Sequence, residues 1–307
     1  MPGAPGMPAA GTVAAPQPAL ASRTRQLLSD LLELTKPKVQ SLLLLTTVAS
    51  MYVAGDPAVS LVLLTCHGGY MSAGGAGAIN HYFDRDIDAQ MARTANRPVP
   101  SGRIPPRVAL LFGCTLAACS VVLLWLAVNP LAAGLSFAGF LGYVFVYTFW
   151  LKRRSPQNIV IGGAAGAVPP LVGWAAVTGS VSGTALLMFF IVFFWTPPHF
   201  WSLSLLMKDE YAKVGVPMLP VVRGEAETRR QIALYAVLLY VVTQLPFCAG
   251  GFGAIYLVAS VVLGLGFVYG SQLLIRRADR PTALRLYLYS LAYLALLFCS
   301  MVADKHL

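Results

Sequence analysis

Long stretches without charge limit what this chain can fold into more than any other feature of its sequence. Four of them carry no charge apart from Asp56, and they run over residues 39–83, 108–151, 155–207 and 231–275. A helix needs about 20 apolar residues to cross a bilayer, so each stretch is long enough for two crossings. A turn signal stands near the middle of each one, at Gly55-Asp56-Pro57, Asn129-Pro130, Thr178-Gly179-Ser180 and Gly250-Gly251. With a last apolar stretch at about 282–303, the sequence predicts an all-α integral membrane bundle of nine transmembrane helices.

The positive charges support this prediction and give the bundle an orientation. All of the 22 Lys and Arg residues except Lys305 fall in the N-terminal segment or in loops on one side of the predicted bundle. Because Lys and Arg concentrate in cytoplasmic loops, we expect a cytoplasmic N-terminus and an outside C-terminus in a multi-pass protein of a bacterial plasma membrane. This topology accounts for the net charge of +10, so no nucleic-acid partner is expected. Membrane lipid and phosphorylated substrates suit such a charge.

The first residues of the chain differ in composition from the rest. Residues 1–24 are rich in Pro, Ala and Gly and contain no apolar run, which is typical of a disordered arm. Residues 25–307 are predicted to form a single membrane domain. Its first part, Arg25–Leu34, is amphipathic and is expected to lie on the cytoplasmic surface.

The stretch from Asn80 to Arg103 is unusually polar for this chain. On a helix, Asn80, Asp84 and Asp88 are spaced four apart and share one face, whereas Asp86 points nearly the opposite way. Two carboxylates on one face repel each other, and Mg²⁺ would remove the conflict because it binds through one or two carboxylates, waters and phosphate oxygens. The alternative is a solvated acidic turn between two helices. The position at the membrane boundary, where carboxylates are costly, favours the functional interpretation.

Basic side chains suited to phosphate stand close to this acidic face. Arg93 and Arg97 follow it and can each hold phosphate through two hydrogen bonds. Thr148 and Lys152 share a face at the end of the fourth predicted span, with Tyr147 beside them. The alternative is a purely structural role, because many membrane spans end in an aromatic belt with a basic anchor.

A second polar centre follows the sixth predicted span. It contains Thr196-Pro197-Pro198-His199-Phe200-Trp201, then Lys208-Asp209-Glu210-Tyr211. His199 and Glu210 are close to three helical turns apart, so on one helix they lie on the same side. Both polar loops follow even-numbered spans and therefore face the same side of the membrane. Two such acidic loops could each hold a metal and clamp a diphosphate between them.

These residues resemble a known family. The pattern Asn80-x-x-x-Asp84-x-x-x-Asp88 before Arg93-Thr94-x-x-Arg97-Pro98 is similar to the first motif of the UbiA-type intramembrane prenyltransferases. Within that superfamily, Thr35-Lys36-Pro37-Lys38, Asn158-Ile-Val-Ile-Gly162-Gly163 and the second polar centre with Gly215-Val216-Pro217-Met218-Leu219-Pro220 resemble the protohaem farnesyltransferase branch. The match runs from about Thr35 to the end. It implies a nine-helix bundle with a cytoplasm-facing central cavity and two Asp-rich motifs that bind Mg²⁺ and an isoprenyl diphosphate.

The resemblance also implies roles for individual residues. The substrates would be farnesyl diphosphate and protohaem, joined at a haem vinyl group with addition of water and release of diphosphate. The resemblance implies one set of residues for metal binding and catalysis, and a second set for binding the diphosphate. The first set is Asn80, Asp84, Asp88, Asp209 and Glu210. The second set is Lys36, Lys38, Arg93, Arg97, Tyr147 and Lys152.

Two departures from the superfamily pattern bear on these roles. Other branches carry a second motif with two acids four residues apart, but here the upstream positions hold His199 and Met207. The superfamily pattern Tyr-x-x-x-Lys reads one residue out of register, since Tyr147 and Lys152 are five apart.

A histidine is expected to bind the haem iron, and the chain has four candidates. His306 lies on the far side of the membrane, His67 lies mid-span, and His81 is turned about 100° from the Asn80 face. His199 is therefore the candidate haem ligand, although it could equally hydrogen-bond to backbone or replace the missing acid in diphosphate binding.

Two other functions compete with this interpretation. A prenyltransferase of the same fold could act on an aromatic quinone precursor, which the His199 motif disfavours. A secondary transporter would carry its charges at the membrane midplane, whereas these acids lie at one face. A haem A synthase, which would use the product, is a further candidate partner.

Overall fold

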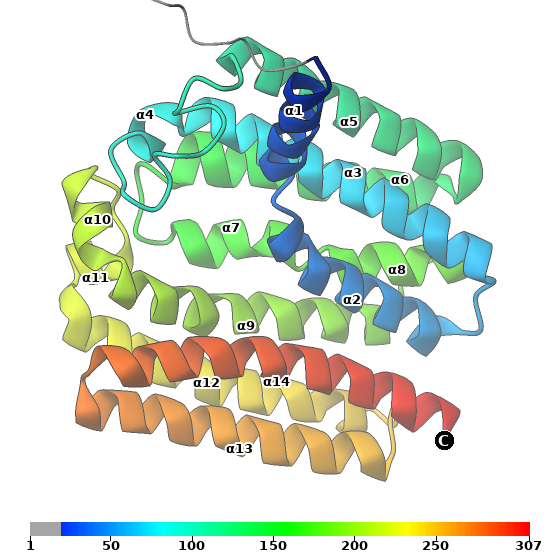
Figure 1. Ribbon diagram of the computed structural model, residues 1–307. Helices are drawn as coiled ribbons and strands as arrows, with labels where there is room; N and C mark the ends of the chain where they lie inside the picture. Colours follow the sequence, from blue (N-terminus) through cyan, green and yellow to red (C-terminus); the bar gives the residue numbers. More distant parts are fainter. Residues whose placement is uncertain (1–19) are drawn as a thin grey trace, which may run out of the picture.

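Every regular element in the described part of the chain is a helix. The computed structural model describes residues 20–307, and Figure 1 shows its helices lying roughly side by side. The helices in chain order are α1 Leu20–Leu34, α2 Pro37–Ala54, α3 Val59–Phe83, α4 Arg85–Asp88, α5 Pro106–Ala127, α6 Pro130–Leu141, the π-helix η1 Gly142–Leu151, α7 Asn158–Gly166, α8 Pro169–Thr178, α9 Gly183–Leu206, α10 Lys208–Lys213, α11 Leu219–Val222, α12 Gly224–Cys248, α13 Ala254–Arg277 and α14 Arg280–His306.

The all-α membrane class predicted from the sequence is confirmed. In the described part, 7 helices are long and apolar enough to cross a membrane, counting α6 with η1 and α7 with α8 as single spans. The chain is thus a multi-pass membrane protein. The predicted count of nine is not confirmed, because α2 and α3 are not among these 7. Both stand where the first two spans were predicted, but α2 carries Lys38 and Gln40 in its first turn and α3 is rich in glycine.

The predicted turns coincide with helix boundaries, whereas the predicted domain boundary lies inside α1. All four turn signals mark helix boundaries: Gly55-Asp56-Pro57 and Gly250-Gly251 lie between helices, Pro130 begins α6, and Thr178 ends α8. Of the predicted arm 1–24, residues 1–19 lie outside the described residues. Residues 20–24 belong to α1, so the helix begins earlier than the predicted domain boundary at residue 25.

The helices form two groups with a third set between them. α9, α12, α13 and α14 pack together in one half, and α3 packs on α5 and α6 in the other. α2, α7 and α8 lie between these groups, with α2 in contact with both α8 and α14 (Figure 1). The short elements α4, α10 and α11 gather at one end of the bundle, which we call the polar end (Figure 1).

The tightest contact between α2 and α8 depends on a glycine. A Cβ at Gly173 would lie 2.2 Å from the carbonyl oxygen of Thr47, well inside van der Waals contact. One turn further along α2, the Ser50 hydroxyl donates a hydrogen bond of 2.6 Å to the Pro170 carbonyl. Small residues at such crossings let helix backbones approach closely in membranes. The contact therefore fixes α8 against α2.

Adding a methyl group at this crossing is expected to destabilise the protein. Gly173→Ala should cost about 1–3 kcal/mol of folding free energy, because the extra carbon forces the two backbones apart. The measurement is the midpoint of thermal unfolding in detergent. Gly134→Ala on α6 is the matched control, since its Cβ meets nothing within 4 Å. An equal loss in both variants would contradict the account of the crossing.

α1 is held against the polar loop that connects α4 to α5. The carboxylate of Asp30 on α1 is buried and accepts a hydrogen bond of 2.9 Å from Arg103. Glu33 accepts a second one from the same guanidinium at 3.2 Å. The next residue, Leu34, is fully buried in a small cluster with Val99 and Ile104 of the loop. These contacts hold the loop, and with it Arg93 and Arg97, near the start of α2.

Candidate active site

The acidic face predicted from the sequence lies at the polar end, where α3 ends. Asn80, Asp84 and Asp88 are 3%, 1% and 3% exposed. α3 stops at Phe83, but the backbone keeps the four-residue spacing: the Asp84 N–H bonds to the Asn80 carbonyl and the Asp88 N–H to the Asp84 carbonyl. The alternative of a solvated acidic turn is therefore wrong for these three residues. It describes Asp86, which is exposed and pairs with Arg153 as expected for the opposite surface.

A different basic residue holds each of the three acidic-face side chains. The Lys36 Nζ donates to the Asn80 Oδ1 at 2.5 Å, and the Lys152 ammonium contacts Asp84 Oδ2. Arg97 donates to Asp88 Oδ2 at 2.7 Å. Asn80 in turn donates to Asp84 Oδ2 at 2.6 Å and to the Thr148 hydroxyl at 3.2 Å. A buried charge is tolerated only when it is paired and hydrogen-bonded, and this network meets that need.

Lys36 has an unusual backbone conformation at this site. It lies in the left-handed region, with φ 55 and ψ 55, immediately before α2. That conformation costs a residue with a Cβ roughly 1–2 kcal/mol, so the surrounding contacts hold it in place. Burial, with Arg97 and Lys152 nearby, lowers the pKa of Lys36 to about 7. A strained, buried cation of this kind is typical of functional sites.

The π-helix η1 explains the unusual spacing of Tyr147 and Lys152. The Lys152 N–H donates to the Tyr147 carbonyl at 2.9 Å, five residues back. Residues five apart then share a face, as residues four apart do on an α-helix. Gly162 on α7 leaves room for the Tyr147 ring, since a Cβ there would lie 2.5 Å from it. The spacing that departs from the superfamily pattern therefore still brings both side chains to one surface.

Arg93 remains unpaired at this surface: no ion pair or side-chain hydrogen bond of Arg93 occurs within residues 20–307. It interacts electrostatically with Tyr147 and with Tyr211 of α10. Tyr211 is buried, and burial raises the pKa of its hydroxyl. Arg97, Lys152 and Asp88 also lie within electrostatic range of the Tyr211 hydroxyl, so α10 lies near the acidic face. The second polar centre thus contributes a residue that the sequence did not single out.

The oxygens of the acidic face fit a hard cation such as Mg²⁺, which prefers oxygen ligands. Asp84 Oδ1 is buried without a hydrogen-bond partner, and Arg153 approaches it only to 3.8 Å. Asp88 supplies a second carboxylate and Asn80 an amide oxygen. No group of three or more His, Cys, Asp or Glu side chains able to hold a metal is found in the described residues. The candidate oxygen ligands in this group are therefore two carboxylates and an amide, fewer than a hard cation binds, so phosphate oxygens and water could fill the other positions.

The structure does not join the second acidic pair to this group. Asp209 is exposed and lines a small surface pocket with Glu225, Asp279 and Arg280. Glu210 is half-buried, and its Oε2 is buried without a hydrogen-bond partner. The prediction that His199 and Glu210 share the side of one helix fails, because α9 ends at Leu206 and α10 starts afresh at Lys208.

His199 packs between α9 and α14. Its ring stacks on Trp195 at 4.2 Å and on Tyr287 at 4.9 Å between centroids. Its Nδ1 forms a hydrogen bond of 2.6 Å with the Ser290 hydroxyl. Its hydrogen-bond partner is therefore a side chain of α14 and not the backbone.

Lys38 and Arg153 lie at the edge of this site. Lys38 is exposed on the first turn of α2 and lines neither the acidic face nor the pocket described below. Arg153 was not predicted as a site residue, and it donates a hydrogen bond of 2.7 Å to the Phe83 carbonyl at the end of α3. Local spacing could not reveal this contact, because the two residues are 70 positions apart in the sequence.

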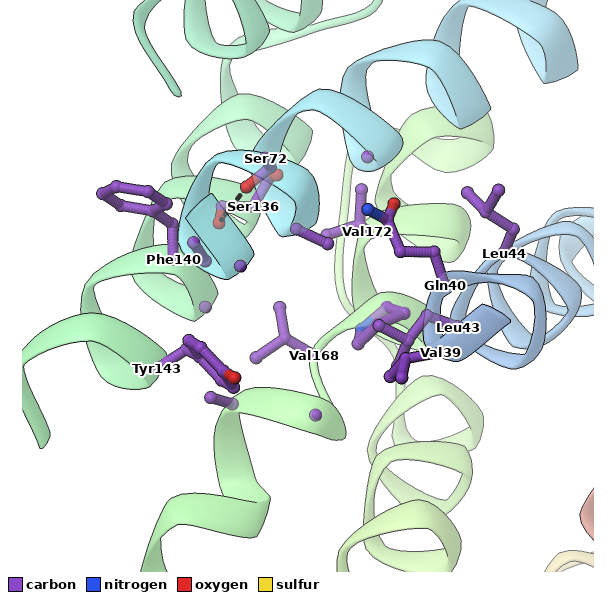
Figure 2. A pocket seen from close by; sticks show the side chains of 18 of the residues that line it. Val39, Gln40, Leu43, Leu44, Ser72, Ser136, Phe140, Tyr143, Val168 and Val172 are labelled. Atoms are coloured by element: carbon purple, nitrogen blue, oxygen red, sulfur yellow. Dashed lines mark hydrogen bonds between the residues drawn. The ribbon is translucent and has the colours of Figure 1, made fainter. Parts of the chain in front are cut away.

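An apolar pocket begins at Lys36 and runs away from the acidic face. Its volume is about 220 Å³, and its walls come from α2, α3, α6, η1 and the α7–α8 segment. Figure 2 shows Leu43, Phe140, Tyr143 and Val168 converging on it. Gln40 is the main polar side chain within it and bonds to the Thr35 carbonyl. Lys36 both lines the pocket and binds Asn80, so the cationic site opens directly onto an apolar cavity.

The chain resembles known proteins over nearly its whole length. A protoheme IX farnesyltransferase from Chloroflexus aurantiacus is 53% identical and covers 92% of this chain, which spans 48% of that protein. One from Saccharophagus degradans is 48% identical, with 91% of this chain and 92% of that protein covered. The chain thus spans about half the length of some curated relatives it matches and nearly all of others.

Solved structures share the fold. A digeranylgeranylglyceryl phosphate synthase structure matches with a TM-score of 0.75 at 20% identity, over 91% of this chain and 98% of that one. A UbiA homologue from Archaeoglobus fulgidus bound to GPP and Mg²⁺ matches with a TM-score of 0.63 at 15% identity, over 89% and 99%. At such identities the likeness concerns the fold alone. A sequence profile of the UbiA prenyltransferase family matches residues 43–298, and on this evidence the chain belongs to the UbiA prenyltransferase family.

Proposed function

We propose that this protein transfers the farnesyl group of farnesyl diphosphate to a vinyl group of protohaem IX. One observation carries the proposal: a buried cluster of cations and carboxylates opens through Lys36 onto an apolar pocket. A diphosphate with an isoprenoid tail needs both surfaces side by side. The names of the relatives, about half identical over most of the chain, support farnesyl diphosphate and protohaem as the two substrates.

The diphosphate is bound by the basic residues around the acidic face. Lys36, Arg97 and Lys152 already contact Asn80, Asp88 and Asp84, and Arg93 has no other partner in the part of the chain that the structure describes. Guanidinium groups bind phosphate through paired hydrogen bonds, and the lysines add point charges. Lys38 lies further out and would act on the approaching diphosphate.

Asn80, Asp84 and Asp88 would hold Mg²⁺, whereas Asp209, which is exposed and lines a separate surface pocket, and Glu210 lie outside this group. When bound, the metal neutralises the charge that develops on the leaving diphosphate. The related structure with GPP and Mg²⁺ supports this assignment. The buried, unpaired Oδ1 of Asp84 supports it independently.

The reaction breaks the bond between C1 of the farnesyl group and the diphosphate oxygen, and the electron pair leaves with the diphosphate. The vinyl π electrons of protohaem then form the new carbon–carbon bond. The cation moves to the carbon beside the porphyrin, where a water adds and loses a proton. Tyr143 and Tyr147, whose rings lie 5.3 Å apart, are placed to face the allylic cation and exclude water until the vinyl group attacks.

His199 is the proposed ligand of the haem iron. Its Nδ1 bonds to Ser290, which leaves Nε2 for the iron. A hydrogen bond of this kind fixes the ring of many metal-binding histidines. We further propose that the polar end faces the cytoplasm of a bacterial plasma membrane, that residues 25–307 form the catalytic domain, and that a haem A synthase receives the product.

The experiment that tests the proposal is a choice between acceptors. Membranes containing the protein are incubated with radiolabelled farnesyl diphosphate and Mg²⁺, together with protohaem or 4-hydroxybenzoate. We expect label in the extracted haem and an equal release of diphosphate. Label in 4-hydroxybenzoate instead would identify a quinone prenyltransferase. Uptake of label into vesicles without diphosphate release would identify a transporter.

A further inference from the structure

The apolar pocket extends along α2, from Lys36 just before the helix to Thr47. These two lining residues are about 16 Å apart at the helical rise of 1.5 Å per residue. α3 runs beside α2 here: Gly77 lies against Lys36 at one end, and Gly69 lies against Leu44 near the other. The pocket is therefore an elongated slot with its mouth at the acidic face.

The crossing of α2 and α8 stands at the Thr47 end of the slot. The backbones meet where Gly173 faces the Thr47 carbonyl, and Ser50 bonds to the Pro170 carbonyl. One turn beyond Thr47, Met51 is 0% exposed and packs in a buried cluster with Val172. Val172 also lines the far end of the slot, and Figure 2 shows its place opposite Phe140 and Tyr143.

The length of this slot matches one isoprenoid better than its neighbours. With carbon–carbon bonds of about 1.5 Å, extended geranyl, farnesyl and geranylgeranyl chains measure about 9, 14 and 19 Å. A slot of about 16 Å accepts the 15-carbon chain, leaves a void behind the 10-carbon chain, and is too short for the 20-carbon chain. The void loses packing contacts, and the longer chain meets Met51.

We propose that Met51 and Val172 form the floor that sets the length of the prenyl chain this protein accepts. The proposal rests on the proposed function, since it assumes that the slot holds the tail of the prenyl diphosphate. It assigns the choice of substrate to two residues that contact neither the diphosphate nor the acidic face. Chain length is read at the end of the slot remote from the chemistry.

The test is a competition among three diphosphates. Membranes containing each variant receive protohaem and equimolar geranyl, farnesyl and geranylgeranyl diphosphates, and the prenylated haems are separated by mass. Met51→Ala removes the floor, and we expect the ratio of geranylgeranyl to farnesyl transfer to rise at least about 10-fold. Val172→Phe raises the floor, and the ratio of geranyl to farnesyl transfer should rise similarly, since a few methylene groups in an apolar pocket change selectivity about 10–200-fold.

Matched controls change the same residue types away from the slot. Met188 on α9 is also 0% exposed, and Val262 on α13 is 63% exposed, so Met188→Ala and Val262→Phe should keep the wild-type ratios. Where Val172→Phe does not accumulate in the membrane, Val172→Leu gives a smaller shift in the same direction. Unchanged ratios in the floor variants would overturn the proposal. Failure of the unaltered protein to transfer any of the three chains would overturn the proposed function instead.

Discussion

Asp84→Asn is expected to lower farnesyl transfer at least about 10²-fold while the protein still inserts in the membrane. Asp84 is 1% exposed and accepts hydrogen bonds from Asn80 and Lys152. Asparagine keeps the shape of the side chain but removes the negative charge that would hold the metal beside the diphosphate. Loss of one electrostatic contribution of this kind costs about 10²–10³-fold in other enzymes. The measurement is the initial rate of label incorporation into haem at matched protein level.

Asp86→Asn is the matched control, because it makes the same change two residues away. The side chain of Asp86 is 57% exposed and pairs with Arg153. That hydrogen bond lowers the pKa of Asp86 to about 2, yet exposed ion pairs contribute little to stability. We expect a rate within about 2-fold of the unaltered protein. Equal losses in the two variants, or an active Asp84→Asn protein, would show that the acidic face is not the reaction centre.

Lys152→Met is expected to reduce both activity and stability. The ammonium contacts Asp84, and the side chains of the pair are 13% and 1% exposed. Removing one partner of a buried pair leaves an uncompensated charge, at a cost of about 3–5 kcal/mol. The same change removes a cation from the diphosphate site. We expect at least about 10²-fold slower transfer and a lower unfolding midpoint in detergent.

The double change Lys152→Met with Asp84→Asn separates these two effects. It removes both charges, so it should recover the lost stability without recovering activity. Arg154→Met is the control for loss of a neighbouring cation, since Arg154 is exposed and lies outside the acidic face. If Lys152→Met were as active and stable as Arg154→Met, the contact with Asp84 would have no role.

Local periodicity predicted the part of the site that lies on one continuous stretch of backbone. Asn80, Asp84 and Asp88 follow a four-residue spacing, and the backbone keeps this spacing through the end of α3. Asp86 lies on the opposite surface for the same reason. The uncharged runs predicted the helices in the same way, because the membrane requires them to be long and apolar.

Features that depend on contacts between distant segments were not predictable. The π-helix at η1 places Lys152 beside Asp84, and the left-handed conformation of Lys36 is held by its bond to Asn80. The residue spacing of an α-helix predicts neither the π-helix nor the left-handed conformation. After the break at Leu206, Tyr211 is buried near the acidic face whereas Asp209 is exposed. In each case tertiary packing overrides the local pattern.

The most direct test of the central claim is the mass of the haem made in cells. The protein is expressed in a bacterial host that makes protohaem but lacks haem O, and the haems are extracted and weighed by mass spectrometry. The account predicts a new haem heavier than protohaem by one farnesyl group and one hydroxyl group, both on the same former vinyl group. Protohaem alone, from cells in which the protein is present in the membrane, would contradict it.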